Sequence, residues 1–226
     1  MRTVSLIFLI LSSVILPAAC FTFSCLRLRR NLLFPMGGAA CFALFGILPD
    51  RMIFSALGTA TPAMYMLSVS DPQRFSLLVS VCSAAILVSG IYIIMKKISP
   101  VDLDSFTVIS FGCGFSALQV LWRYGIDTVY MIATRQSRLY DPVILSFAAA
   151  RSLSLFITGV CVCILVSENV LKTKAVYTLL AFSILSLCLY PVMLSSKSAA
   201  STSVMIVSAI LGAMCASYVL GKRRIL

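Results

Sequence analysis

The chain has 226 residues, of which 61% are hydrophobic and 11% charged, and its mean hydropathy is +1.07. This apolar share is far above that of a soluble domain, so lipid must be the solvent of the folded chain. The net charge of +11 does not indicate nucleic acid, because basic residues beside apolar segments are first of all topology signals.

Seven apolar stretches approach the length of about 20 residues that a helix needs to cross the hydrocarbon core of a bilayer. In chain order, we predict membrane spans at residues 4–23, 32–48, 75–95, 106–122, 142–166, 175–194 and 202–220. These spans use most of the chain, so no soluble domain of ordinary size fits between them. The sequence therefore predicts an all-α, polytopic membrane protein, with residues 1–226 as one bundle of about seven transmembrane helices.

Basic residues decide the predicted orientation of these spans. If the connections alternate between the two sides, ten Lys and Arg residues fall on one side and seven on the other. The ten also lie close to the span ends, where the positive-inside rule counts most. They are Arg27, Arg29, Arg30, Lys96, Lys97, Lys172, Lys174, Lys222, Arg223 and Arg224. We therefore expect a cytosolic carboxyl terminus and an amino terminus that is lumenal or extracellular.

The first predicted span also has features of a signal peptide. Arg2 precedes an apolar core, and the small residues Ala18 and Ala19 follow it, as at a cleavage site. Pro17 fits a bacterial lipobox poorly. Cleavage would leave six spans and place both termini in the cytosol, so this alternative stays open.

Small residues recur at four-residue intervals in several spans. In lipid, helices associate through close backbone approach and interhelical hydrogen bonds, and small residues favour both. Four-residue spacing places such residues along one helix face. The predicted helix-contact residues are Gly112 and Ser116 in the fourth span, Ser146, Ala150, Ser154 and Thr158 in the fifth, and Ser208, Gly212 and Ala216 in the seventh. They serve either the internal packing of the bundle or a face for a partner's helix, and both interpretations stay open.

Two polar side chains within the spans, Arg151 and Gln119, are candidate polar anchors. Arg151 lies about nine residues into the fifth span, where snorkelling to the interface is strained. None of the predicted spans contains a carboxylate that would pair with it. We expect its guanidinium to meet backbone carbonyls, Gln119 or a carboxylate of another polypeptide, or else to reach the span boundary.

Catalytic constellations are missing from the sequence. The chain has no histidine, which excludes intramembrane zinc proteases with histidine ligands and removes the usual base of a serine protease. An aspartyl protease needs two carboxylates sharing one site, but Asp102 and Asp104 fall in a connection. Asp141 precedes Pro142 and is better explained as a helix N-cap. We therefore predict no catalytic residue, no metal site and no cofactor.

Several local strings follow one another in an order known from one membrane protein family. The third span runs from Phe75 to Tyr92 and ends in Lys96-Lys97, and the fourth contains Ser110-Phe111-Gly112 with Ser116 four residues later. The fifth contains Thr158-Gly159 and is followed by Glu168. With the seven spans and their orientation, these strings resemble the anterior-pharynx-defective (Aph) subunit family of gamma-secretase.

Some positions depart from that family. Val108 and Ser116 stand where the family has glycine, and its two intramembrane histidines are absent, the first falling near Leu155 or Phe156. A polar contact inside the bundle is therefore either absent or rebuilt from other side chains.

The resemblance implies a noncatalytic scaffold or stabilising subunit, embedded in the lipid bilayer. It also implies three partners: a presenilin-like aspartyl protease, a nicastrin-like glycoprotein and the presenilin-enhancer subunit. The expected location is the endoplasmic reticulum, the Golgi and later membranes, including the plasma membrane. Two other classes stay open, a seven-helix receptor and a small membrane transporter. Short cytosolic connections disfavour the receptor, and the lack of paired helix breaks in matching halves disfavours the transporter.

Overall fold

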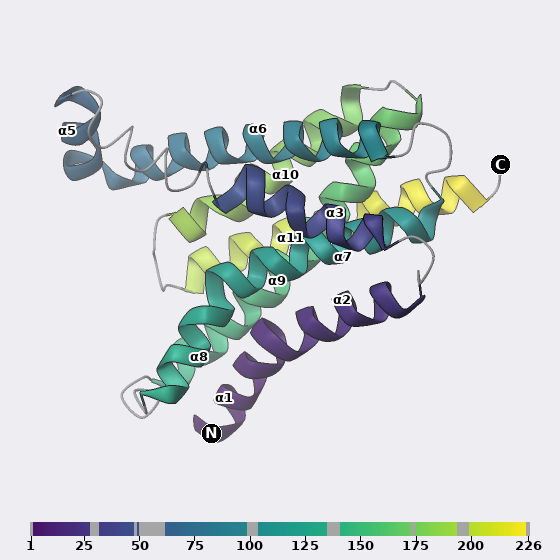
Figure 1. Ribbon diagram of the computed structural model, residues 1–226. Helices are drawn as coiled ribbons and strands as arrows, with labels where there is room; N and C mark the ends of the chain where they lie inside the picture. Colours follow the sequence, from purple (N-terminus) through teal and green to yellow (C-terminus); the bar gives the residue numbers. More distant parts are fainter. Residues whose placement is uncertain are drawn as a thin grey trace.

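The computed structural model describes residues 2–27, 32–47, 49, 62–98, 104–134, 141–172, 175–193 and 199–224. These residues are almost wholly helical, and no strand occurs among them (Figure 1). Six helices within these ranges are long and apolar enough to cross a membrane, which confirms the prediction of an all-α, polytopic fold. Arg29, Arg30, Asp102 and Lys174, used above, lie outside the described residues.

The first half of the chain forms four helical segments. The N-terminal helix comprises α1 (Arg2–Ile10), the π-helical turn η1 (Leu11–Ile15) and α2 (Leu16–Arg27). Next come α3 (Leu33–Phe42) with the π-helical turn η2 (Ala43–Ile47), then α5 (Pro62–Ser70) and α6 (Pro72–Ile98). Pro17 has no N–H to donate to the carbonyl of Ser13, and the irregular turn η1 lies just before it, where a proline disrupts the regular ladder.

The second half contains the central helices. α7 (Ser105–Val120) continues through the π-helical turn η3 (Leu121–Gly125) into α8 (Ile126–Ala133). α9 (Pro142–Lys172), α10 (Ala175–Met193) and α11 (Ala199–Arg224) follow. The helix pairs in contact include α7 with α2, α3 and α9, and α9 with α1, α10 and α11. α9 is central, because 78% of its most apolar stretch is buried, against 28% in the N-terminal helix.

The second predicted span is a short helix in the structure. α3 has 10 residues and η2 has 5. At 1.5 Å per residue they extend about 22 Å, less than the hydrocarbon thickness of about 30 Å. We predicted seven spans, and the described part of the chain contains six helices long enough to cross a membrane. That residues 32–48 also cross the membrane stays a prediction.

Most of the other spans lie in helices longer than predicted, and two of these extensions include acidic residues. The predicted span 106–122 lies in a helix that continues to Ala133, and the predicted span 142–166 lies in one that reaches Lys172. Asp127 and Glu168 therefore lie inside these helices, beyond the predicted ends of the two spans. The hydropathy falls at Asp127 and Glu168, but the helices do not end there, because backbone hydrogen bonding continues past both residues.

Aspartate followed by proline begins two of the long helices. The Asp141 carboxylate accepts a hydrogen bond from the Val143 N–H at 2.9 Å, which confirms the predicted N-cap. Asp71 accepts in the same way from the Arg74 N–H at 3.1 Å, before Pro72. Proline suits the first helical position because its missing N–H would have no intrahelical partner.

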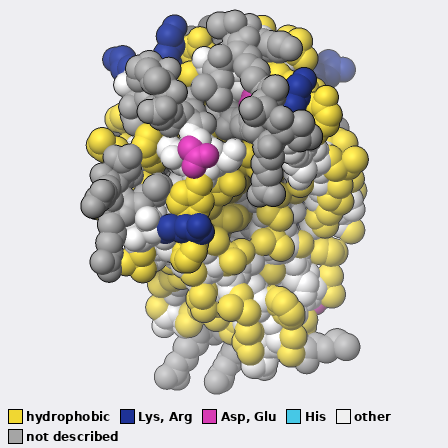
Figure 2. All heavy atoms as spheres, turned by 90° about the vertical axis from the view of Figure 1, so that its right-hand side faces the viewer, with side chains coloured by type: hydrophobic (Ala, Val, Ile, Leu, Met, Phe, Trp, Pro, Cys, Tyr) yellow, Lys and Arg dark blue, Asp and Glu magenta, His cyan; other side chains and the backbone are white. Residues whose placement is uncertain are grey.

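The outer surface of the bundle is predominantly apolar. Figure 2 shows hydrophobic side chains over most of the described part of one face, with few Lys and Arg side chains. Large apolar side chains exposed in the structure include Leu33, Met214 and Tyr218. Such faces are suited to lipid or to other membrane helices.

Candidate functional site

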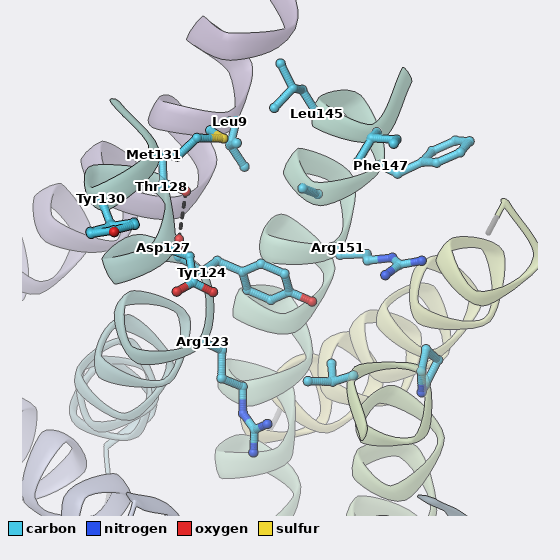
Figure 3. Close-up of a pocket in the computed structure, with 14 residues that line it drawn as sticks. Leu9, Arg123, Tyr124, Asp127, Thr128, Tyr130, Met131, Leu145, Phe147 and Arg151 are labelled. Atoms are coloured by element: carbon cyan, nitrogen blue, oxygen red, sulfur yellow. Dashed lines mark hydrogen bonds between the residues drawn. The ribbon is translucent and has the colours of Figure 1, made fainter. Parts of the chain in front are cut away.

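A cavity of about 440 Å³ lies where η3, α8, α9, α10 and α1 meet, at the end of the bundle where α8 ends and α9 begins (Figure 3). This volume lies within the range of about 300–1,000 Å³ that is usual for small-molecule sites. Its polar and charged lining consists of Arg123, Tyr124, Asp127, Thr128, Tyr130 and Arg151. Its main apolar lining consists of Leu9, Met131, Leu145, Phe147 and Val192.

Hydroxyl groups of α11 hold the Arg151 side chain, which is only 7% exposed. Its Nε donates to the Thr202 Oγ1 at 3.0 Å, and its Nη2 donates to the Ser201 Oγ. The sequence analysis expected backbone carbonyls, Gln119 or a partner's carboxylate, and it missed these two hydroxyls. The run Ser201-Thr202-Ser203 at the start of the last span was the available signal.

The π-helical turn η3 supplies two neighbouring lining residues, Arg123 and Tyr124. Turns of this kind occur often at functional sites. Figure 3 shows the Tyr124 ring extending towards the helix that carries Arg151. The Thr128 hydroxyl donates to the Tyr124 carbonyl at 2.7 Å and anchors the first turn of α8 to η3.

A cluster of buried polar side chains lies at the interface between α7 and α9. Ser116 and Gln119 are fully buried on α7 and face Gly159 of α9. The Ser116 hydroxyl and both amide atoms of Gln119 have no hydrogen-bond partner among the described residues. The predicted polar anchor Gln119 is thus buried within the bundle. Its amide NH2 group could donate a hydrogen bond to another polar group, and its amide oxygen could accept one.

Further hydroxyls extend the buried polar groups to the last two helices. Thr158 of α9, Cys188 of α10 and Ser208 of α11 are also buried, and the Thr158 hydroxyl has no hydrogen-bond partner among the described residues. Four helices therefore contribute polar groups to the middle of the bundle. Polar side chains at membrane depth face the bundle interior in this way.

The predicted glycines lie at close helix contacts inside the bundle. A Cβ atom at Gly112 would lie 3.1 Å from the Val160 Cα and 3.3 Å from the Cys163 Cβ, so α7 and α9 approach each other there. At Gly212, a Cβ atom would lie 3.3 Å from the Cys161 Cβ, at the contact of α11 with α9. Ala216, one turn further along α11, is also buried.

The four small residues of the fifth span, Ser146, Ala150, Ser154 and Thr158, differ in burial and in their neighbours. Ser146 is exposed, and its hydroxyl bonds that of Ser5 in α1 at 3.0 Å. Ala150 is half-buried, while Ser154 is buried and donates to the Ala150 carbonyl at 2.8 Å. Thr158 is fully buried. Residues four apart are offset by about 40° around a helix, so the series turns gradually away from α1 and into the bundle.

Two sets of contacts were missed by the sequence analysis. Serines of the N-terminal helix bond to its neighbours: Ser12 accepts from the Ser152 hydroxyl at 2.7 Å, and Ser13 donates to the Thr128 hydroxyl at 3.2 Å. In addition, α3 and α7 are in close backbone contact, because a Cβ atom at Gly114 would collide with the Pro35 carbonyl. The Gly-x-Gly spacing of residues 112 and 114 was the available signal, since residues two apart point to nearly opposite helix faces.

Comparison with protein-family models, curated proteins and solved structures finds no match for this chain. Its function is therefore inferred from its residues and their arrangement.

Proposed function

We propose that this chain is a noncatalytic scaffold and stabilising subunit of an intramembrane aspartyl protease complex of the gamma-secretase kind. In this proposal it binds a presenilin-like protease, a nicastrin-like glycoprotein and the presenilin-enhancer subunit. It supports the processing of membrane proteins in the endoplasmic reticulum, the Golgi and the plasma membrane. Seven spans with a lumenal amino terminus belong to the same proposal.

One packing relationship carries the proposal. Two of the strings that resemble the Aph family, residues 110–116 and 158–159, lie far apart in the sequence and meet at one helix interface. Gly112 lies against Val160, and Ser116 lies against Gly159. Such close backbone approach is the usual basis of stable helix association in lipid. The two strings that resemble the Aph family therefore both contribute to the packing of α7 against α9.

The buried polar cluster supports the same reading. Members of the family place histidines inside the bundle, and this chain has buried Leu155 and Phe156 near the position of the first. Ser116, Gln119 and Thr158 are buried nearby on the same two helices, α7 and α9. We infer that these side chains occupy the place of the histidine contact, with polar atoms that have no hydrogen-bond partner among the described residues.

The chemistry of the cavity is that of a binding site. Among its described lining residues, Asp127 is the one carboxylate, and it lies with Arg123 and Arg151. Aspartyl proteolysis needs two carboxylates in one site, and nucleophilic catalysis needs a base beside the nucleophile. This lining offers neither arrangement, which favours a noncatalytic role.

A pair of matched glycine variants tests whether the α7–α9 contact supports assembly. Gly112→Leu places a large side chain against Val160, whereas Gly221→Leu adds the same side chain where the described residues leave open space. We expect the first variant to recover much less protease complex in affinity purification and the second to recover as much as wild type. Gly112→Ala, a smaller intrusion, keeps the test informative if the leucine variant fails to fold. Equal complex recovery with all three would contradict the proposal.

A further inference from the structure

We propose that the cavity between η3, α8 and α9 binds an amphipathic anion, a medium-chain carboxylate whose head group lies at the end lined by Arg123, Tyr124 and Arg151 and whose chain lies along the apolar wall. This inference is independent of the scaffold function and does not require any partner subunit.

The charged lining favours an anion. Arg123 and Arg151 contribute two positive charges and Asp127 one negative charge, so the described lining has a formal excess of one positive charge. Arginine forms charge-assisted, often bidentate hydrogen bonds with carboxylates. The Tyr124 phenol extends towards the helix of Arg151 and adds a neutral donor (Figure 3).

Arg151 is held in place before any ligand binds. Its Nε and Nη2 donate to the Thr202 and Ser201 hydroxyls, which are both neutral acceptors. A charged side chain that is already ordered loses little rotamer freedom on binding. The α11 hydroxyls therefore orient a cation at the cavity wall.

The apolar and charged parts of the lining are separated. Figure 3 shows Leu9, Met131 and Leu145 together towards one end of the cavity and Arg123 at the other, with Tyr124, Asp127 and Arg151 between them. Leu9, Met131 and Leu145 also form a small buried cluster with Ala149. A ligand with a charged head and one apolar chain matches this division, whereas a small inorganic anion would leave the apolar wall unused.

The depth of the arginines indicates which way the ligand lies. Arg151 follows Pro142 by nine residues, about 14 Å of helix, and Arg123 precedes Ala133 by ten residues, about 15 Å. Met131 and Leu145 are closer to those helix ends. The carboxylate is therefore the deeper end of the bound ligand, and the chain points towards the bundle end.

The single tryptophan of the chain, Trp122, precedes Arg123 in the turn η3 and serves as the fluorescent probe for a ligand bound beside Arg123. With the full chain in nanodiscs, 2-bromodecanoate places its heavy atom beside the carboxylate, and 10-bromodecanoate places it at the chain end. We expect saturable quenching of Trp122 fluorescence that is stronger for the 2-bromo compound, and displacement of both compounds by unlabelled decanoate. Equal quenching by the two isomers, or equal displacement by acetate, would overturn the proposal.

Charge variants give effects of opposite sign. Arg123→Gln should weaken decanoate binding about tenfold, as expected for one lost charge-assisted hydrogen bond. Asp127→Asn should strengthen binding about threefold by removing the opposing charge. Arg74→Gln removes a charge from an exposed arginine at the start of α6 and should change nothing. Tighter binding by the Asp127 variant is not a result that misfolding produces, and weaker or unchanged binding there would contradict the assignment.

Discussion

Gly159 of α9 lies so close to Ser116 of α7 that a Cβ atom at residue 159 would collide with the Ser116 hydroxyl oxygen. The same Cβ atom would lie 3.1 Å from the Gln119 Oε1. A side chain at residue 159 and the Ser116 side chain would thus occupy the same small space between α7 and α9.

The first prediction concerns this contact. Gly159→Ala should destabilise the bundle by about 1–3 kcal/mol, because overpacking forces neighbours apart. Ser116→Ala removes the atom with which the new methyl group collides, so the double variant should recover part of the loss. Thermal unfolding in one detergent, analysed as a double-mutant cycle, measures the coupling. Additive effects of the two substitutions would show that they do not share the space.

The second prediction concerns the buried amide of Gln119. Neither of its amide atoms has a hydrogen-bond partner among the described residues, so a leucine of similar volume removes a desolvation cost. Gln119→Leu should raise the free energy of unfolding by about 1–2 kcal/mol. Gln73→Leu, at an exposed position of α6, is the matched control and should stay within about 0.5 kcal/mol. Destabilisation by Gln119→Leu would mean that the amide makes bonds essential to the fold.

The third prediction concerns the support of Arg151. Replacing both of its hydroxyl partners, with Ser201→Ala and Thr202→Val, leaves a buried charge with fewer hydrogen bonds and should cost about 3–5 kcal/mol. Arg151→Met removes the charge while retaining an apolar side chain, and should cost less. Ser203→Ala, at an exposed hydroxyl that bonds the Ala199 carbonyl, serves as control. If Arg151→Met were the more damaging change, the guanidinium would be stabilising the bundle through other contacts.

The fourth prediction concerns the caps of the long helices. Asp141→Ala removes the acceptor of the Val143 N–H and should cost about 1 kcal/mol, whereas Asp141→Asn keeps an acceptor and should cost little. Hydrogen exchange of the first turn of α9 distinguishes local fraying from a global change. Faster exchange in the Asn variant than in the Ala variant would contradict the role of the side chain as a cap.

The sequence predicted the helices well where one physical signal dominates. Long apolar stretches predicted the six long helices, and Asp141 before Pro142 predicted where α9 begins. The same logic applied to Asp71 and Pro72 would have predicted the start of α6. Hydropathy ended the fourth span too early, because it counts Arg123 and Asp127 as unfavourable in a membrane, although the helix continues past both and both line a cavity.

The contacts between helices were harder to predict. In lipid an outward helix face is as apolar as an inward one, so periodicity does not indicate how each helix is rotated. Gly112 was selected by its spacing, yet the same reasoning passed over Gly114, which packs on the opposite neighbour. The partners of Arg151 depend on how α11 lies against α9, which no single helix specifies.

The central claim, that this chain is an assembly subunit, is tested most directly by the identity of what it binds. The measurement is mild-detergent affinity purification of the tagged full-length chain from its native membranes, followed by mass spectrometry of the proteins recovered. We predict recovery of a presenilin-like aspartyl protease with a nicastrin-like glycoprotein. A chain that purifies alone, folded and monodisperse, would contradict the scaffold function.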